Sequence, residues 1–232
     1  MSDRRRGLRD GIPIGLGYLS VSFAFGIQAV SLGLSPLQAV LISMTNLTSA
    51  GQLAGIGLMA GGASLVEMAL AQITINMRYA LMSLSLTQRL GADMTGLRRA
   101  FFAFGNTDEI FAVASGQKGE LNHHYLYALM LAPYLGWSLG TLLGSLAGTL
   151  LPVFFRDVLG IAIYGMFLAI ILPPARSRKS VAAVVLMAAC LSLAFRYLPF
   201  LRNLSGGYAM IISAVVSAAA AALMFPVGEE DE

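Results

Sequence analysis

Residues 121–155 read LNHHYLYALMLAPYLGWSLGTLLGSLAGTLLPVFF and contain no lysine, arginine, aspartate or glutamate. An α-helix needs about 20 apolar residues to cross about 30 Å of hydrocarbon, and this run is longer than that. Charge-free runs also cover residues 158–175 and 203–228, and Glu67 is the only charge between residues 11 and 77. Charged residues make up 12% of the chain, about half the share that is usual in a soluble domain. We therefore expect an all-α, polytopic helical membrane protein.

Apolar segments follow one another along the whole chain, so residues 1–232 are expected to form a single transmembrane transporter domain, with a basic N-terminus at 1–10 and an acidic tail at 227–232. Segments such as SAVVSAAAAALMF at 213–225 are apolar on all sides, whereas the strands of an outer-membrane barrel alternate in polarity. We expect six to seven transmembrane helices, including broken or re-entrant segments. The predicted segments are 11–32, 37–61, 63–87, 97–114, 124–150, 158–172, 181–198 and 204–225.

The basic residues favour two segments that enter the membrane and return. If every segment crossed, with the N-terminus inside, Arg89, Arg98 and Arg99 would face outward, although cytoplasmic loops normally carry the lysine and arginine. If 37–61 and 97–114 are re-entrant, most basic residues lie in the cytoplasm. That group is Arg4, Arg5, Arg6, Arg9, Arg89, Arg98, Arg99, Lys118, Arg176, Arg178 and Lys179, against Arg156, Arg196 and Arg202 outside. The alternative is that both segments are ordinary helices with buried polar residues.

These two segments also contain the backbone least suited to lipid, namely SMTNLTSAGQ at 43–52 and FGNTDE at 104–109. Non-helical backbone at membrane depth occurs where it is buried in protein or lines a water-filled cavity. A break exposes helix ends, whose N–H groups suit a carboxylate and whose carbonyls suit an ammonium. A zwitterionic amino acid fits such a cavity, as does another small polar solute. The residues predicted to line the path in the first segment are Thr48, Ser49, Gly51 and Gln52.

Arg78 lies in the middle of the predicted span 63–87, eleven residues from both Glu67 and Arg89. That is about 16 Å of helix each way, and a charged side chain at such depth normally faces the protein interior and has a partner. Its predicted partners are Asp108 and Glu109, one to neutralise Arg78 and the other to stay available to a proton or a solute. Asn76 continues the polar face beside Arg78. The alternative is an ion pair that only fastens two helices.

Other features predict packing rather than chemistry. Cys190 is the only cysteine and His123 and His124 are the only histidines, so we expect no metal site and no cofactor. The basic residues at helix ends are explained by topology, and no nucleic-acid role is expected. Four small residues recur every four positions and favour close helix packing. They are Gly136, Gly140, Gly144 and Gly148.

Four strings give the chain a resemblance to a known family: GIPIGLGYLSVSFAFG at 11–26, SAGQ at 49–52, INMRYALMSLSL at 75–86 and NTDEIFA at 106–112. In order and spacing they resemble the AzlC-like branched-chain amino acid exporters of bacteria. The sequence departs from that pattern at 45–53, which is more polar than the family usually is. The family's pattern falls on Gly17, Tyr18, Gly26, Ser49, Gly51, Gln52, Asn76, Arg78, Asp108 and Glu109.

The resemblance implies the large subunit of an exporter of leucine, isoleucine and valine, working with a small AzlD-type membrane subunit. It implies a multi-pass protein of the bacterial cytoplasmic (inner) membrane, with a cytoplasmic N-terminus. The sequence has no phosphate-binding loop, so we expect a secondary transporter, with proton coupling as one route. Alternatives are an exporter or channel for another small zwitterion or anion, and an intramembrane enzyme, for which no nucleophile–base pair is visible.

Overall fold

The computed structural model describes residues 2–226, without the side chains at 153, 156, 157, 159, 160, 162, 163 and 166. The predicted position of Arg156 and the acidic tail at 227–232 therefore lie outside the described part. Within it the chain is helical and contains no β-strand, apart from one isolated bridge between Leu90 and Leu121. The expectation of an all-α membrane protein is confirmed. Helices long and apolar enough to cross a bilayer in the described residues are Asp3–Ser31, His123–Leu150, Lys179–Tyr197 and Gly206–Met224.

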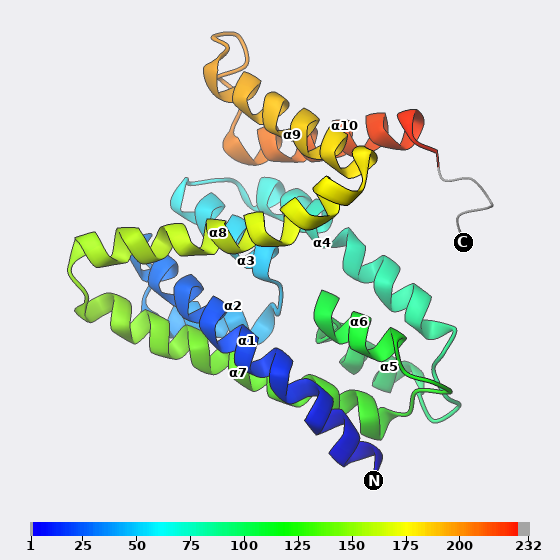
Figure 1. Ribbon diagram of the computed structural model, residues 1–232. Coiled ribbons are helices and arrows are strands. Elements are labelled where there is room, and N and C mark those ends of the chain that lie inside the picture. Colours follow the sequence, from blue (N-terminus) through cyan, green and yellow to red (C-terminus); the bar gives the residue numbers. More distant parts are fainter. Residues whose placement is uncertain (1, 227–232) are drawn as a thin grey trace. The chain divides into compact units, whose positions relative to one another are not determined.

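Every predicted segment is helical, and the ends differ by a few residues (Figure 1). The largest difference is at the N-terminus, where the basic residues continue the first helix outward to Asp3. The segments 37–61 and 97–114 are each divided into two helices by a short break, at 46–48 and 105–107. The helices are α1 (Asp3–Ser31), α2 (Pro36–Thr45), α3 (Ser49–Ala60), α4 (Leu65–Thr87), α5 (Gly96–Phe104), α6 (Asp108–Ser115), α7 (His123–Leu150), α8 (Val153–Ser177), α9 (Lys179–Tyr197) and α10 (Gly206–Met224).

The chain divides into two compact units. Unit 1 comprises Met1–Ile56 and Asn76–Ile163, and unit 2 comprises Gly57–Ile75 and Tyr164–Glu232. Helices α3, α4 and α8 pass from one unit to the other, because each unit boundary falls within one of them. Both breaks and all of the predicted site residues belong to unit 1.

The long helices α1 and α7 form the centre of unit 1 and lie side by side (Figure 1). Their N-termini lie at the same end: Gly7 faces Tyr125, and further along α1 the backbone of Ile27 faces Gly148. The predicted glycine stripe of α7 is the surface on which α1 lies, so it meets a helix of the same chain. A Cβ at Gly136, Gly140 or Gly144 would overlap the backbone of α1, and only glycine allows this close approach.

Local sequence explains where several helices begin. Ser35 and Gln38 form a capping box at the start of α2, with Pro36 in the first helical position. The side chain of Asn122 accepts a hydrogen bond from the backbone N–H of Tyr125, 2.9 Å away, and caps α7. These caps explain why α2 begins at Pro36 and α7 at His123.

Unit 2 contains a buried carboxylate that the sequence did not assign to any role. Glu67, in the first turn of α4, is only 4% exposed. Its Oε1 accepts hydrogen bonds from Ser205 Oγ (2.6 Å) and from the backbone N–H of Gly207 (2.8 Å). These donors lie at the N-terminus of α10, where a negative charge is favourable. Glu67 therefore fastens α4 to α10 within this unit.

Candidate functional site

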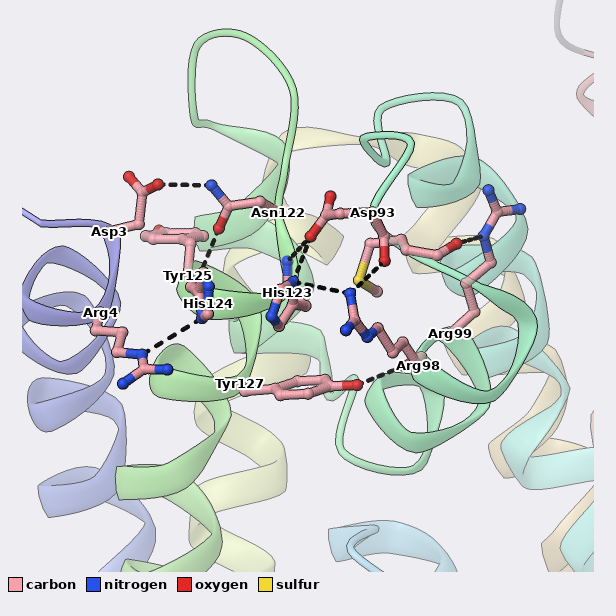
Figure 2. Close-up of polar contacts among 11 residues, drawn as sticks. Asp3, Arg4, Asp93, Arg98, Arg99, Asn122, His123, His124, Tyr125 and Tyr127 are labelled. Atoms are coloured by element: carbon pink, nitrogen blue, oxygen red, sulfur yellow. Dashed lines mark hydrogen bonds and ion pairs between the residues drawn. The ribbon is translucent and has the colours of Figure 1, made fainter.

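Helices α5 and α6 form a hairpin whose two ends lie at one end of unit 1. At the start of α5, Arg98 Nη1 lies 3.3 Å from Nδ1 of His123, the first residue of α7. After the end of α6, Arg89 donates to the backbone carbonyls of Ser115 and Gln117. Figure 2 shows Arg4, Arg98 and Arg99 together at this end, which we call the basic end. The start of α5 and the end of α6 thus lie at the same end of unit 1, and that residues 97–114 enter a membrane and return stays a prediction.

The break between α5 and α6 lies away from the basic end. Tyr18, which contacts it, is nine residues beyond Arg9, or about 13 Å along α1. A Cβ at Gly105 would displace the side chain of Met130 on α7. Thr107 then starts α6, and its side chain accepts a hydrogen bond from the backbone N–H of Ile110. This places Asp108 and Glu109 in the first turn of a helix, where the backbone dipoles favour negative charge.

Arg78 pairs with the first of these carboxylates. Its Nη1 lies 2.8 Å from Oδ2 of Asp108, and its Nη2 donates to the Tyr79 hydroxyl at 3.1 Å. The guanidinium also stacks over the Tyr79 ring, 4.8 Å from its centroid. The Arg78 and Asp108 side chains are 45% and 42% exposed, so the ion pair is not enclosed by the described residues. The structure brings together the three charged residues that the sequence singled out.

Glu109, the second carboxylate, is held by Tyr18. The buried phenol of Tyr18 donates a hydrogen bond to Glu109 Oε2, and its oxygen lies 2.6 Å from Thr107 Oγ1. The ring of Tyr18 packs edge-on against Trp137, with centroids 5.2 Å apart. Leu47, in the break between α2 and α3, belongs to the same buried cluster as Tyr18 and Trp137. Tyr18 is therefore linked directly to the second break and, through this cluster, to the first.

Gln52 closes the break between α2 and α3 and is almost fully buried, at 1% exposure. Its Nε2 donates to the backbone carbonyls of Ile42 (3.2 Å) and Asn46, which also accept hydrogen bonds from the backbone N–H groups of Asn46 and Thr48. Its Oε1 accepts from Trp137 Nε1 at 2.9 Å. The side chain predicted to contact substrate thus has all of its polar atoms engaged in holding the end of α2.

The other predicted residues of this segment line the same break. Thr48 donates to Oδ1 of Asn46 at 3.0 Å. Gly51 allows α4 to approach, because a Cβ there would come within 2.8 Å of Oδ1 of Asn76. Ser49 is the first residue of α3 and is partly buried. Thr48, Gly51 and Asn76 are therefore close together.

Polar contacts that the sequence did not indicate complete the site. Asn106 Nδ2 donates to Ser83 Oγ at 3.1 Å and joins the second break to α4. Ser43 and Thr141 share a buried hydrogen bond of 2.7 Å between α2 and α7. Trp137, to which no role was assigned from the sequence, is buried and donates to Gln52. In the sequence, the polar composition of residues 43–52 and 104–109 indicates the two helix breaks. It does not indicate which side chains these segments contact.

The histidines lie at the basic end and not at this site. His123 and Asp93 are paired: Asp93 Oδ2 accepts from the backbone N–H of His123 at 2.9 Å and contacts its ring nitrogen (Figure 2). The backbone hydrogen bond, followed by that of the imidazole, lowers the pKa of the Asp93 carboxyl. His124 accepts from Arg4 Nε at 3.3 Å. No group of three possible metal ligands occurs among the residues that the structure describes.

The part of the chain that contains this site also matches a known protein family. A sequence model described as "AzlC protein" matches residues 13–151, which include both breaks and the residues around them. The chain belongs to the AzlC protein family. No solved structure matches the chain.

AzlC-family relatives are membrane proteins from bacteria and archaea. The chain is 28% identical to "Inner membrane protein YgaZ" of Escherichia coli, over 80% of this chain and 79% of that protein. It is 36% identical to an "Uncharacterized membrane protein" of Archaeoglobus fulgidus, over 84% and 85% of the two chains. A similar protein of Helicobacter pylori is 28% identical over 64% of this chain and 68% of its own length. The alignments thus extend the AzlC assignment over most of the chain.

Proposed function

We propose that this AzlC-family protein is a secondary transporter that exports branched-chain amino acids across the bacterial cytoplasmic membrane. The observation that carries the proposal is the pair of adjacent polar contacts at the break before α6. Arg78 faces Asp108, and Tyr18 faces Glu109, on neighbouring residues. An amino acid carries one carboxylate and one ammonium, which need a cation and an anion a few ångströms apart.

The roles follow from which groups can exchange partners. The solute carboxylate takes the place of Asp108 on Arg78, because a guanidinium binds carboxylates in a two-pronged geometry. The solute ammonium competes with the Tyr18 hydroxyl for Glu109. The released Asp108 is then the group that accepts a proton, which is the route to proton coupling. The aliphatic side chain of the substrate comes from the family resemblance, as does the small AzlD-type partner subunit.

The test is efflux of labelled leucine from proteoliposomes that contain the full chain with its co-purified small subunit. Arg78→Ala is expected to lower efflux about tenfold or more, because a hydrogen bond to a charged group contributes about 1.5–3 kcal/mol. Arg78→Lys keeps the charge but loses the forked geometry, so partial loss is expected. Arg5→Ala, an exposed arginine near the start of α1, is the matched control and is expected to export normally.

Two results would contradict the proposal. If no aliphatic amino acid leaves the vesicles in the presence of the small subunit, the substrate is wrong. If Arg78→Ala lowers only the yield and the remaining protein exports leucine at the normal rate, the Arg78–Asp108 pair is structural. If the rate of leucine efflux does not change with an imposed pH step, transport is not coupled to protons, and the proposal of an exporter is unaffected.

A further inference from the structure

A groove of about 600 Å³ lies between α1, α5 and α7 of unit 1. It starts at the basic end, where Arg4, His123 and His124 line it. The remaining lining is apolar or aromatic, apart from two tyrosine hydroxyls that are already engaged. Tyr127 donates to the carbonyl of Arg98 at 3.3 Å, and Tyr134 donates to the carbonyl of Met44 at 3.2 Å.

The groove has the depth of one lipid leaflet. Its α7 wall is formed by His124, Tyr127, Leu131 and Tyr134, whose spacing of three or four residues puts them on one helix face. Ten residues separate the first from the last, so the wall is about 15 Å long. The hydrocarbon core of a bilayer is about 30 Å thick, and one leaflet is half of that.

Aromatic pairs fix the width of the groove. On α5, Phe101 packs edge-on against Tyr127 with centroids 5.1 Å apart, and Phe104 against Tyr134 with centroids 6.3 Å apart. Aromatic rings thus line the groove at two levels along its length.

The lining also excludes the amino acid itself. Below its mouth, the groove offers a polar solute no unused hydroxyl or charge along its walls, so a zwitterion would lose its water without replacement. Leu131 remains 47% exposed on the outer side, as expected for a side chain that meets hydrocarbon. At the mouth, Arg4 and His124 contact one another (Figure 2), and arginine pairs well with a phosphate.

We propose that the groove binds an anionic phospholipid of the leaflet at the basic end, with its phosphate at Arg4 and His124 and one acyl chain along α7. Basic pockets between membrane helices are suited to anionic headgroups. The far end of the chain then reaches Tyr134, which holds Met44 at the end of α2. The lipid therefore braces the first break, and its binding is independent of the transport proposal.

The experiment is native mass spectrometry of the detergent-purified full chain, with phosphatidylglycerol or phosphatidylcholine of the same acyl chains. We expect one retained phosphatidylglycerol and little phosphatidylcholine. Arg4→Ala is expected to weaken the binding of phosphatidylglycerol about fivefold, since one basic residue near anionic lipid contributes about 1 kcal/mol. Arg5→Ala is the control, because Arg5 is an exposed neighbour on α1 that does not line the groove.

A second variant tests the apolar part separately. Leu131→Trp fills the groove without changing its charge and is expected to abolish lipid retention. Equal retention in Leu131→Trp, or equal binding of both lipids by the native chain, overturns the proposal. A photoreactive side chain introduced at Leu131 gives a readout that does not depend on the tryptophan variant. Cross-linking to phosphatidylglycerol supports the lipid, and cross-linking to the small subunit instead would overturn it.

Discussion

Replacing Gln52 separates a structural role from a substrate-binding role for this residue. Gln52→Met keeps the length of the side chain and removes three hydrogen bonds, to Ile42, Asn46 and Trp137. A buried hydrogen bond contributes about 1 kcal/mol net to stability, so the loss is about 3 kcal/mol. For a chain of this size, 1 kcal/mol changes the melting temperature by about 2–4 °C. We therefore expect the melting temperature to fall by about 6–12 °C.

The assay is thermal unfolding of the purified protein in detergent, followed by leucine efflux from the fraction that stays folded. Gln28→Met on α1 is the matched control, because the structure gives the Gln28 side chain no hydrogen bond within the described residues. The control is expected to melt like the native chain. If Gln52→Met also melts like the native chain but raises the KM for leucine, Gln52 contacts substrate and our reasoning about the break is refuted.

Two further predictions concern the packing of unit 1 and the basic end. Gly144→Ala is expected to lower the melting temperature by several degrees, because a Cβ there overlaps the backbone of Phe23 and overpacking costs about 1–3 kcal/mol. The control is Gly17→Ala, on an open face of α1, which should leave the melting temperature unchanged or raise it. Equal effects of the two substitutions would contradict the close packing of α7 on α1. The contact of Asp93 with His123 lowers the pKa of the Asp93 carboxyl. The contact therefore stabilises the fold at a pH above the ordinary aspartate pKa of about 4, and this stabilisation is lost as the pH falls through the lowered pKa. In unfolding scans between pH 6 and about pH 3, Asp93→Asn should therefore lose less stability than the native chain, and parallel curves would contradict this assignment.

The membrane helices were predictable because their signal is the absence of charge over a length set by the bilayer. The charge-free run at 121–155 led to a predicted helix at 124–150, and α7 spans His123–Leu150. At the N-terminus the same signal stopped at residue 11, since it depends on apolar side chains. Four arginines continue α1 for two more turns, as arginine is a good helix former. The sequence therefore located the apolar part of that helix and missed its polar extension.

The breaks were predictable for a different reason, which is that a helix at membrane depth rarely carries so many side chains able to bond its own backbone. SMTNLTSAGQ and FGNTDE each contain a break. The partners within the site were harder to predict, because they depend on which helices lie together. Charge complementarity was enough to pair Arg78 with Asp108. Nothing in the local sequence showed that Gln52 would bond Trp137, which lies 85 residues away.

Tyr18 gives the strongest reason to treat the two breaks as one site. Its hydroxyl holds Glu109 and lies beside Thr107 in the second break, while its ring belongs to the buried cluster that contains Trp137 and, from the first break, Leu47. A buried side chain cannot change position without disturbing its neighbours, because protein interiors are densely packed. A solute ammonium that takes Glu109 from Tyr18 therefore leaves a phenol that must find a new partner or move against Trp137, the residue that holds Gln52. We therefore expect a solute bound at the second break to affect the first through Tyr18 and Trp137.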